Sequence, residues 1–181
     1  MSEDRLSSGW SRAIRAGLSF RAMTDDDMPF MARLYAAARA EELAALPWSD
    51  AEKAAFVRMQ FDAQHAHYRH AYPKADWLVT MRSGEDIGRL YIDRGASDCH
   101  IIDIAFMPEQ RGKGLGSAML ADVLDEAAHC NKAVSIHVET VNPARQLYRR
   151  LGFVVVEDEG IYELMRWTSG KLTCVANQST S

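Results

Sequence analysis

A glycine-rich turn between two apolar segments places the strongest constraint on how this chain can fold. Residues 101–106 are apolar except for Asp103, and residues 108–118 read Pro-Glu-Gln-Arg-Gly-Lys-Gly-Leu-Gly-Ser-Ala. From Leu115 onward, apolar side chains recur at helical spacing. Met107 precedes a proline and should therefore stay extended, which ends the apolar segment as a strand. The pattern predicts a strand, a tight turn and the start of a helix.

This turn predicts a binding site for an anion. The first N–H groups of a helix have no partner within the helix, and the helix dipole adds positive charge at the same end. Such a site suits a phosphate or a pyrophosphate. Gly112, Gly114 and Gly116 let the backbone approach the ligand without a Cβ in the way, and Arg111 and Lys113 add positive charge at the rim.

Two common phosphate-binding motifs do not fit the spacing of these glycines. A P-loop needs a glycine five residues before Gly112, where the chain has none. A dinucleotide fingerprint that starts at Gly112 or Gly114 meets Ser117 or Met119 where a glycine or alanine is required. The pattern that fits is Arg-x-x-Gly-x-Gly, which begins at Arg111. In this pattern the chain resembles the GNAT superfamily of acyl-CoA N-acyltransferases, in which such a loop holds the pyrophosphate of coenzyme A.

A second segment strengthens the resemblance. Residues 142–153 read Asn-Pro-Ala-Arg-Gln-Leu-Tyr-Arg-Arg-Leu-Gly-Phe and are similar to the second signature of the same family, Asn-x-x-Ala/Arg-x-x-Tyr-x-x-x-Gly-Phe. The resemblance implies acetyl-CoA as the co-substrate and no metal. The residues that it implies for binding coenzyme A are Ile104, Ala105, Phe106, Arg111, Gly112, Lys113, Gly114, Leu115, Gly116, Ser117, Asn142 and Tyr148.

The composition is typical of one ordinary globular domain. The chain has 181 residues, of which 48% are hydrophobic and 25% charged. Its net charge of −4 argues against a nucleic-acid-binding protein, which would be basic. Three well-separated cysteines support neither a disulfide scaffold nor a zinc site, so we expect a cytoplasmic protein. We recognise no signal peptide and no apolar stretch of about 20 residues that could span a membrane.

We expect a single domain over residues 18–167, preceded by a flexible arm over 1–17 and followed by a polar tail over 168–181. Helices are predicted to begin near Thr24, Ser49, Leu115 and Asn142. The predicted strands cover residues 18–23, 77–81, 87–92, 100–106, 133–139, 154–156 and 162–167.

This order predicts an α/β (α+β) fold, with a mixed, mostly antiparallel sheet and helices on both faces. It matches the acyl-CoA N-acyltransferase fold of the family. The resemblance implies that the two central strands, 100–106 and 133–139, splay apart, and that the gap admits the pantetheine arm of coenzyme A.

Two candidate catalytic bases lie on the strand over 100–106. An amine acceptor must lose a proton in the reaction, and Asp103 or His100 could accept it directly or through a water molecule. Because side chains alternate along a strand, the two should face opposite sides of the sheet unless a bulge shifts the register. Each also has a structural interpretation, as a hydrogen-bonded buried acid for Asp103 and as a solvated strand-end residue for His100.

The other catalytic roles come from the resemblance. It implies that a backbone N–H within Ile104–Phe106 polarises the thioester carbonyl. It also implies that Tyr148 acts as the general acid toward the coenzyme A sulfur, and that Asn142 binds pantetheine or shapes the gap. The alternative for Tyr148 is a ring that packs in the core with its hydroxyl at the surface. The alternative for Asn142 is a helix cap, and this role and the binding role can hold together.

The histidines at 65, 67 and 70 do not make a metal site, because no carboxylate or thiol completes a set at ligand spacing. We therefore predict an N-acetyltransferase that moves an acetyl group from acetyl-CoA to a primary amine by direct attack in a ternary complex. The expected acceptor is a small-molecule amine, with a protein lysine or N-terminal amine as an alternative. The other alternative is a non-catalytic acyl-CoA-binding sensor. We expect no nucleic-acid or membrane partner, and a homodimer is compatible with the sequence.

Overall fold

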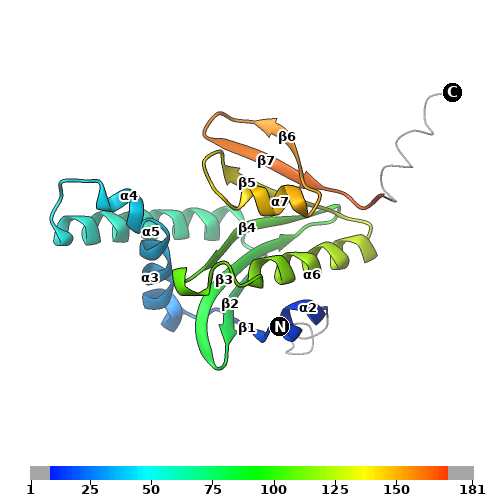
Figure 1. Cartoon of the computed structure of the whole chain (residues 1–181), viewed down its shortest axis with the longest axis horizontal. Helices are drawn as coiled ribbons and strands as arrows, with labels where there is room; N and C mark the ends of the chain where they lie inside the picture. The colour runs from blue at the N-terminus through cyan, green and yellow to red at the C-terminus, as the bar shows by residue number, and fades with distance from the viewer. Residues whose placement is uncertain (1–8, 171–181) are drawn as a thin grey trace.

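Seven strands form one mixed sheet through the middle of the molecule (Figure 1). The structure is a computed structural model, which describes residues 9–170 of the chain. The strands are β1 (Leu18–Ala22), β2 (Asp76–Arg82), β3 (Glu85–Arg94), β4 (Asp98–Phe106), β5 (Ala133–Glu139), β6 (Val154–Asp158) and β7 (Tyr162–Trp167). Their order in the sheet is β1-β2-β3-β4-β5-β7-β6, and only β4 and β5 run parallel to each other.

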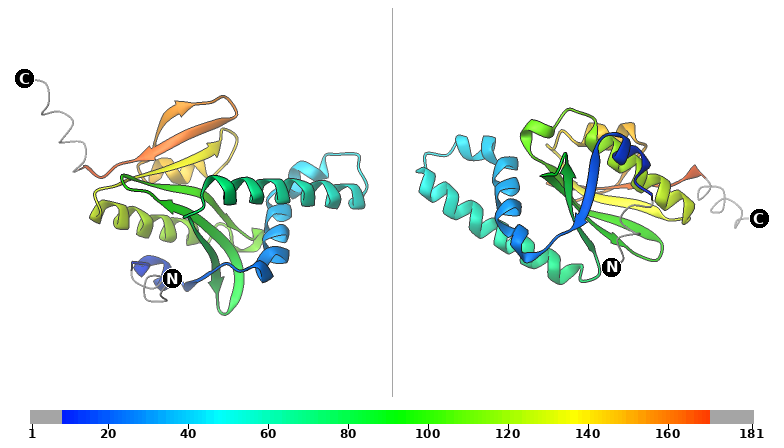
Figure 2. Two further views of the ribbon diagram at one scale, coloured as in Figure 1. Left: turned by 180° about the vertical axis from the view of Figure 1, so that it is seen from behind. Right: turned by 90° about the horizontal axis from the view of Figure 1, so that it is seen from below.

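Helices cover both faces of this sheet (Figure 2). They are α2 (Ser11–Arg15), α3 (Met28–Ala38), α4 (Ala40–Ala44), α5 (Asp50–Ala71), α6 (Leu115–His129) and α7 (Arg145–Arg150), with 3-10 turns at Asp25–Asp27 and Pro108–Gln110. Residues of α2, α6 and α7 pack in a core on one face, and residues of α3 and α5 pack in a core on the other. This arrangement confirms the predicted fold class.

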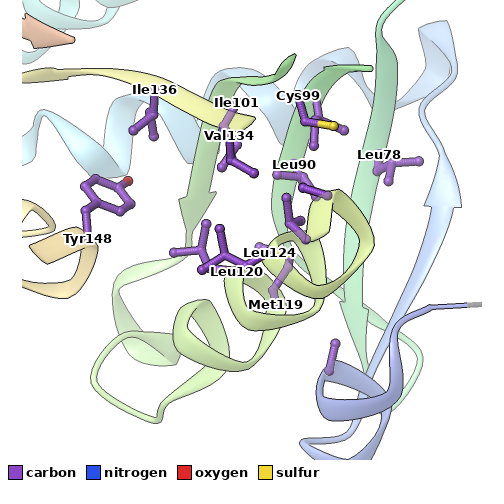
Figure 3. Packing of buried hydrophobic residues seen from close by; sticks show 14 of the residues in the cluster. Leu78, Leu90, Cys99, Ile101, Met119, Leu120, Leu124, Val134, Ile136 and Tyr148 are labelled. Carbon is purple, nitrogen blue, oxygen red and sulfur yellow. The ribbon is translucent and has the colours of Figure 1, made fainter. Parts of the chain in front are cut away.

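The larger core joins α6 to the central strands (Figure 3). Met119 and Leu120 of α6 are fully buried, and they pack in one cluster with Leu90, Ile101 and Val134 from three neighbouring strands. Burial of one such side chain contributes about 2 kcal/mol. This packing places the first turn of α6, and the loop before it, at the end of β4.

The two central strands separate part-way along their length. Their parallel pairing runs from Asp98 and Ala133 to Ile101 and Ile136. Beyond Ile136, β5 continues in a pair with β7 on its other side, while β4 continues in a pair with β3. The end of β4 therefore has a free edge that faces β5, as the family resemblance implied.

Several local signals in the sequence can be recognised in the structure. Ser49 and Glu52 form a capping box at the start of α5. Ser83 and Gly84 adopt positive φ angles of 52° and 82°, which suits the tight turn between β2 and β3. Gly152, with φ of +94°, follows α7, and its N–H bonds to a carbonyl of the last helical turn.

Part of the predicted flexible arm is a helix, which corrects that expectation for residues 10–16. Trp10 and Ala13 are buried in the larger core. The backbone N–H groups of Arg12 and Ala13 donate to the carboxylate of Asp122 on α6, at 2.9 and 2.8 Å. Asp122 therefore caps α2 from more than a hundred residues away, so no local pattern signals this helix. Residues 1–8 of the arm lie outside the described residues.

Three smaller differences concern element boundaries. Helix α4 was not expected, because its five residues carry no periodic apolar pattern. Helix α7 begins at Arg145, three residues after the predicted cap at Asn142. Of the predicted polar tail, Ser169 is buried, and residues 171–181 lie outside the described residues. Within residues 9–170 we find no helix with the length and apolar composition of a membrane span.

Candidate functional site

The loop between β4 and α6 has a backbone conformation that glycine adopts easily. Gly112 and Gly114 have φ angles of +72° and +77°, in the left-handed region. A Cβ added to either residue would meet nothing within 4 Å, so backbone conformation and not crowding requires glycine here. A Cβ added to Gly116, in the first turn of α6, would lie 3.7 Å from Phe106 and Leu147. The loop is therefore open at its two left-handed glycines, and it borders β4 and α7 at the third.

The loop presents a row of free backbone donors. The N–H groups of residues 112–117 have no backbone acceptor within residues 9–170. The next N–H, that of Ala118, bonds to the carbonyl of Gly114 at 3.0 Å and starts the helical pattern. Helix α6 is 15 residues long, so the positive end of its dipole lies at the same place. Free donors and a helix dipole together suit a doubly charged pyrophosphate.

Two basic side chains lie at the rim of this loop. The Nε atom of Arg111 donates to the carbonyl oxygen of Phe106 at 3.0 Å, which ties the guanidinium to the end of β4. The Nζ atom of Lys113 donates to Oε1 of Gln110 at 3.3 Å. Both side chains are exposed and keep further donors for a ligand anion.

The free edge of β4 offers further backbone N–H donors next to this loop. The N–H of Met107 bonds to the carbonyl of Ile87 on β3 at 2.9 Å. Because backbone groups alternate between the two sides of a strand, the N–H of Ala105 also points to β3, whereas those of Ile104 and Phe106 point away from it. Of the predicted donors within Ile104–Phe106, these two therefore face the gap toward β5.

A β-bulge places the two candidate bases on the same face of the sheet. His100 pairs with Asp93 and Asp103 with Tyr91 on β3, while Ile102 is skipped in the register. Asp93 and Tyr91 are two residues apart and share a face, so their partners share it as well. We expected the two side chains on opposite faces unless a bulge shifted the register, and the structure has this bulge. Both side chains lie on the face that α3 and α5 cover.

Asp103 is held by a buried arginine. Its Oδ1 accepts from Nε of Arg89 at 3.1 Å and its Oδ2 from Nη2 of Arg89 at 2.9 Å. Arg89 is only 4% exposed in its side chain, lies over the ring of Tyr91 and donates to Gln64 at 3.4 Å. Both oxygens of Asp103 are thus engaged in a bidentate ion pair, and this arrangement favours a structural role for the carboxylate.

His100 has one ring nitrogen engaged and one without a partner among the described residues. Its Nδ1 lies 2.9 Å from Oγ of Ser135, its register partner on β5. The ring stacks on Tyr72 at 5.5 Å between centroids, and its edge meets the ring of His137 at 5.3 Å. Burial, together with the nearby His137, lowers the pKa of His100 below its usual 6.5. His100 is therefore neutral at pH 7, as a proton acceptor must be.

Tyr148 lies in the larger core beside the gap. It projects from α7 next to Ile136 of β5 (Figure 3) and contacts Phe153 at 5.7 Å between ring centroids. The residue is 4% exposed. Burial, and then the negative charge of Asp103, raise the pKa of Tyr148 above its usual 10. The hydroxyl therefore keeps its proton at neutral pH, as a general acid must.

Asn142 and α7 are fixed by side-chain contacts. Oδ1 of Asn142 accepts from the N–H of Ala144 at 2.9 Å, in a turn that leads into the helix. Asn142 therefore stabilises the turn before α7, and the N-cap position itself is taken by Ala144. The side-chain NH2 of Asn142 has no partner among the described residues and is available to a ligand. Arg145 forms a bidentate pair with Glu163 on β7, which anchors the helix that carries Tyr148.

Three residues of this site escaped the sequence analysis: Arg89, Ser135 and His137. They come from two strands, β3 and β5, and no spacing along the chain connects them. Burial, and then the charge of Asp103, raise the pKa of Tyr68, which places it in the same polar cluster. The only local signal is Arg89 itself, because a charged residue in the middle of an apolar strand needs a partner.

Of the histidines of α5, His65 is half-buried, and His67 and His70 are exposed. His65 packs against Phe61 and Trp77, and His67 lies near Tyr68. Across the described part of the chain, no group of three or more His, Cys, Asp or Glu residues could hold a metal ion. An apolar hollow of about 550 Å³ between α3, α4 and α5 contains none of the predicted site residues.

Comparisons with known proteins agree with this geometry. A family model described as an acetyltransferase (GNAT) domain matches residues 40–174. No curated protein sequence matches the chain. The fold is similar to that of PaiA N-acetyltransferase from Thermoplasma acidophilum in complex with coenzyme A, with 14% identity, coverage of 84% of this chain and 99% of that one, and a TM-score of 0.63.

Two further solved structures have the same fold. An acetyltransferase from Thermus thermophilus is 20% identical, with coverage of 84% and 97% and a TM-score of 0.61. YncA from Salmonella typhimurium, solved with its cofactor acetyl-CoA, is 20% identical, with coverage of 84% and 94% and a TM-score of 0.51.

Proposed function

The chain belongs to the GNAT acetyltransferase family, and from this premise we propose that it moves the acetyl group of acetyl-CoA to a primary amine by direct attack in a ternary complex. The observation that carries the proposal is the continuity of two donor surfaces. The free N–H groups of residues 112–117 lead directly to those of Ile104 and Phe106. A pyrophosphate joined to an extended amide-bearing arm needs donors in this order.

The residues at the loop and the gap fit coenzyme A chemically. The N–H groups of residues 112–117 would hold the pyrophosphate, with Arg111 and Lys113 adding charge at its rim. Ile104 and Phe106 would donate to the pantetheine arm and to the thioester carbonyl, which a fixed donor in a shielded site polarises strongly. The free NH2 of Asn142 would bind the arm from the opposite side.

We assign proton acceptance to His100 rather than to Asp103. A lysine-like amine has a pKa of roughly 10, so presenting it neutral at pH 7 costs about 4 kcal/mol. The carboxylate of Asp103 already accepts two hydrogen bonds from Arg89. His100 is neutral, its Nε2 is uncommitted among the described residues, and it faces the α5 side of the sheet. It would take the proton directly or through one water molecule.

We assign proton donation to Tyr148. Its hydroxyl projects from the α6 side of the gap, opposite the face that carries His100. With the acid and the base on opposite faces of the gap, Tyr148 would donate a proton to the leaving sulfur. His100 would accept the proton of the entering amine. The raised pKa of Tyr148 keeps the phenol protonated until the thiolate forms.

The acceptor in this proposal is a small-molecule amine in a cytoplasmic enzyme, with a protein amine as the alternative. The face under α5 offers the rings of Tyr72 and His137 beside the proposed base, and Tyr68 near Asp103. These groups can pack against and hydrogen-bond an amine of moderate size.

The test is release of free thiol from acetyl-CoA across a panel of polyamines, aminoglycosides, amino acids and peptides. Release with one acceptor class supports the proposal and names the substrate. Binding of acetyl-CoA by calorimetry, without release with any member of the panel, would favour the sensor instead. Absence of binding would overturn the proposal as a whole.

A further inference from the structure

We propose that Ser135 and Asp98 are positioning residues that hold His100 in one tautomer, with the proton on Nδ1 and the lone pair on Nε2. The inference rests on the proposed function, in which His100 accepts the proton of the amine. It adds two residues on neighbouring strands that touch neither substrate. They act only through the ring of His100.

The direction of the hydrogen bonds sets the tautomer. Oγ of Ser135 bonds to Oδ2 of Asp98, and a carboxylate can only accept, so Ser135 donates its proton there. Oγ then has lone pairs but no proton for His100, and the contact at 2.9 Å requires the proton to be on Nδ1 of the ring. The lone pair of the neutral ring is therefore on Nε2, where a base needs it.

This series of contacts ends in an ion pair between Asp98 and Arg166. Oδ1 of Asp98 accepts from Nη2 of Arg166 on β7 at 3.4 Å, so both oxygens of this carboxylate accept a hydrogen bond, one from Arg166 and one from Ser135. Arg166 thus belongs to the same series of contacts, at its outer end.

Strand pairing builds this arrangement. Asp98 and His100 are two residues apart on β4 and share a face, and Ser135 is the register partner of His100 on β5. Ser135 is 5% exposed and lies between Val134 and Ile136 in an otherwise apolar stretch of β5. A buried hydroxyl in this position needs a partner, and its partners are His100 and Asp98.

The charge around His100 comes from several elements. Titratable groups reach it from β3, β4, β5 and the end of α5, namely Asp93, Asp98, His137 and Tyr72. Arg166 of β7 contacts Asp98 rather than His100 itself. His137 favours the neutral ring, and the two aspartates favour the charged ring. Ser135 is uncharged, so its removal should change the tautomer more than the pKa.

The first experiment reads the tautomer without any turnover. Two-bond ¹H–¹⁵N correlation spectra of the histidine-labelled full chain, with His100→Gln for assignment, distinguish a protonated from an unprotonated ring nitrogen. We expect a protonated Nδ1 and an unprotonated Nε2 for His100 above its pKa. We expect Ser135→Ala to move proton population to Nε2, and Ser135→Thr to keep the original tautomer. A protonated Nε2 in the unmodified protein would overturn the inference, whether or not the protein is an enzyme.

The second experiment measures the consequence for catalysis with the acceptor found by thiol release. Ser135→Ala should lower kcat by about ten-fold or more and leave the acetyl-CoA affinity unchanged. Ser135→Thr should recover most of the rate, and the exposed Ser19→Ala should match the unmodified protein. An unchanged kcat in Ser135→Ala would overturn the positioning role. Absence of turnover in the unmodified protein would contradict the proposed function alone, because the spectra still test the tautomer.

Discussion

Arg89 and Asp103 lie diagonally across β3 and β4 and are joined by two parallel hydrogen bonds, of 3.1 and 2.9 Å. The pair stands under α5, where Arg89 is almost completely buried and Asp103 is 16% exposed in its side chain. The pair lies on the same face of the sheet as His100. A charged pair in this position costs desolvation free energy, which only good geometry and further hydrogen bonds offset.

Removal of one partner of this pair should destabilise the fold. We expect Arg89→Met to lower the free energy of unfolding by about 3 kcal/mol, because Asp103 would remain as a largely buried unpaired charge. The double variant Arg89→Met/Asp103→Leu should recover most of the loss, since both charges are then gone. Urea unfolding of the single and double variants measures both effects. Equal stability of the Arg89→Met variant and the unmodified protein would show that solvent compensates the charge.

Substitution of Gly114 should separate ligand binding from fold stability. We expect Gly114→Ala to lower the free energy of unfolding by about 1 kcal/mol, because its φ of +77° is unfavourable for alanine. The new Cβ points into open space and should meet the pyrophosphate, so the affinity for coenzyme A should fall by at least about ten-fold.

Gly160 offers a matched control for this variant. It has φ of +83° and an equally open Cβ direction, but it lies in the turn between β6 and β7. Gly160→Ala should therefore lose similar stability and keep its affinity for coenzyme A, as measured by calorimetry. Equal affinities in the two variants would place the pyrophosphate elsewhere.

Loss of the Tyr148 hydroxyl should affect chemistry but not binding. We expect Tyr148→Phe to reduce kcat by about 10²-fold, since the thiolate then leaves without a general acid. The affinity for acetyl-CoA and the melting temperature should stay close to those of the unmodified protein, because the ring still fills the core beside Phe153. Stopped-flow thiol release with a saturating amine measures the chemical step. A full rate in the Tyr148→Phe variant would assign the thiolate proton to another donor.

The decrease of kcat/KM at acid pH should reflect the protonation of His100. Because burial lowers the pKa of His100, the ring stays neutral down to pH values below 6.5, and kcat/KM should fall only below that value. The same lowered pKa makes the unfolded chain take up the proton first, so this residue costs stability as the pH falls through 6.5 toward its folded pKa.

Two variants test the assignment of this decrease, the acid limb of the pH profile. His100→Gln should remove it and lower kcat/KM at every pH, whereas the exposed His70→Gln should leave the profile unchanged. The measurement is kcat/KM between pH 5 and 9 in buffers of constant ionic strength. An acid limb that persists in His100→Gln would assign proton acceptance to another group.

Elements with a local cause could be predicted from the order of the residues alone. The loop at Gly112 and Gly114, the capping box at Ser49 and the turn at Ser83 follow from backbone sterics and a few neighbouring residues. The order of strands and helices followed from apolar periodicity, and two signatures pointed to the family. These features depend on residues only a few positions apart, so the chain shows them directly.

Features that depend on pairing between distant segments became visible only in the folded chain. A bulge at Ile102 places His100 and Asp103 on one face, and periodicity along a single strand cannot reveal where a register will shift. The partner of Asp103 comes from β3, and that of His100 comes from β5, 35 residues away. Hydrogen bonds and ion pairs of this kind form only after hydrophobic packing and strand pairing bring the segments together. The sequence therefore named both base candidates, and our proposal to choose His100 rests on contacts that only the fold supplies.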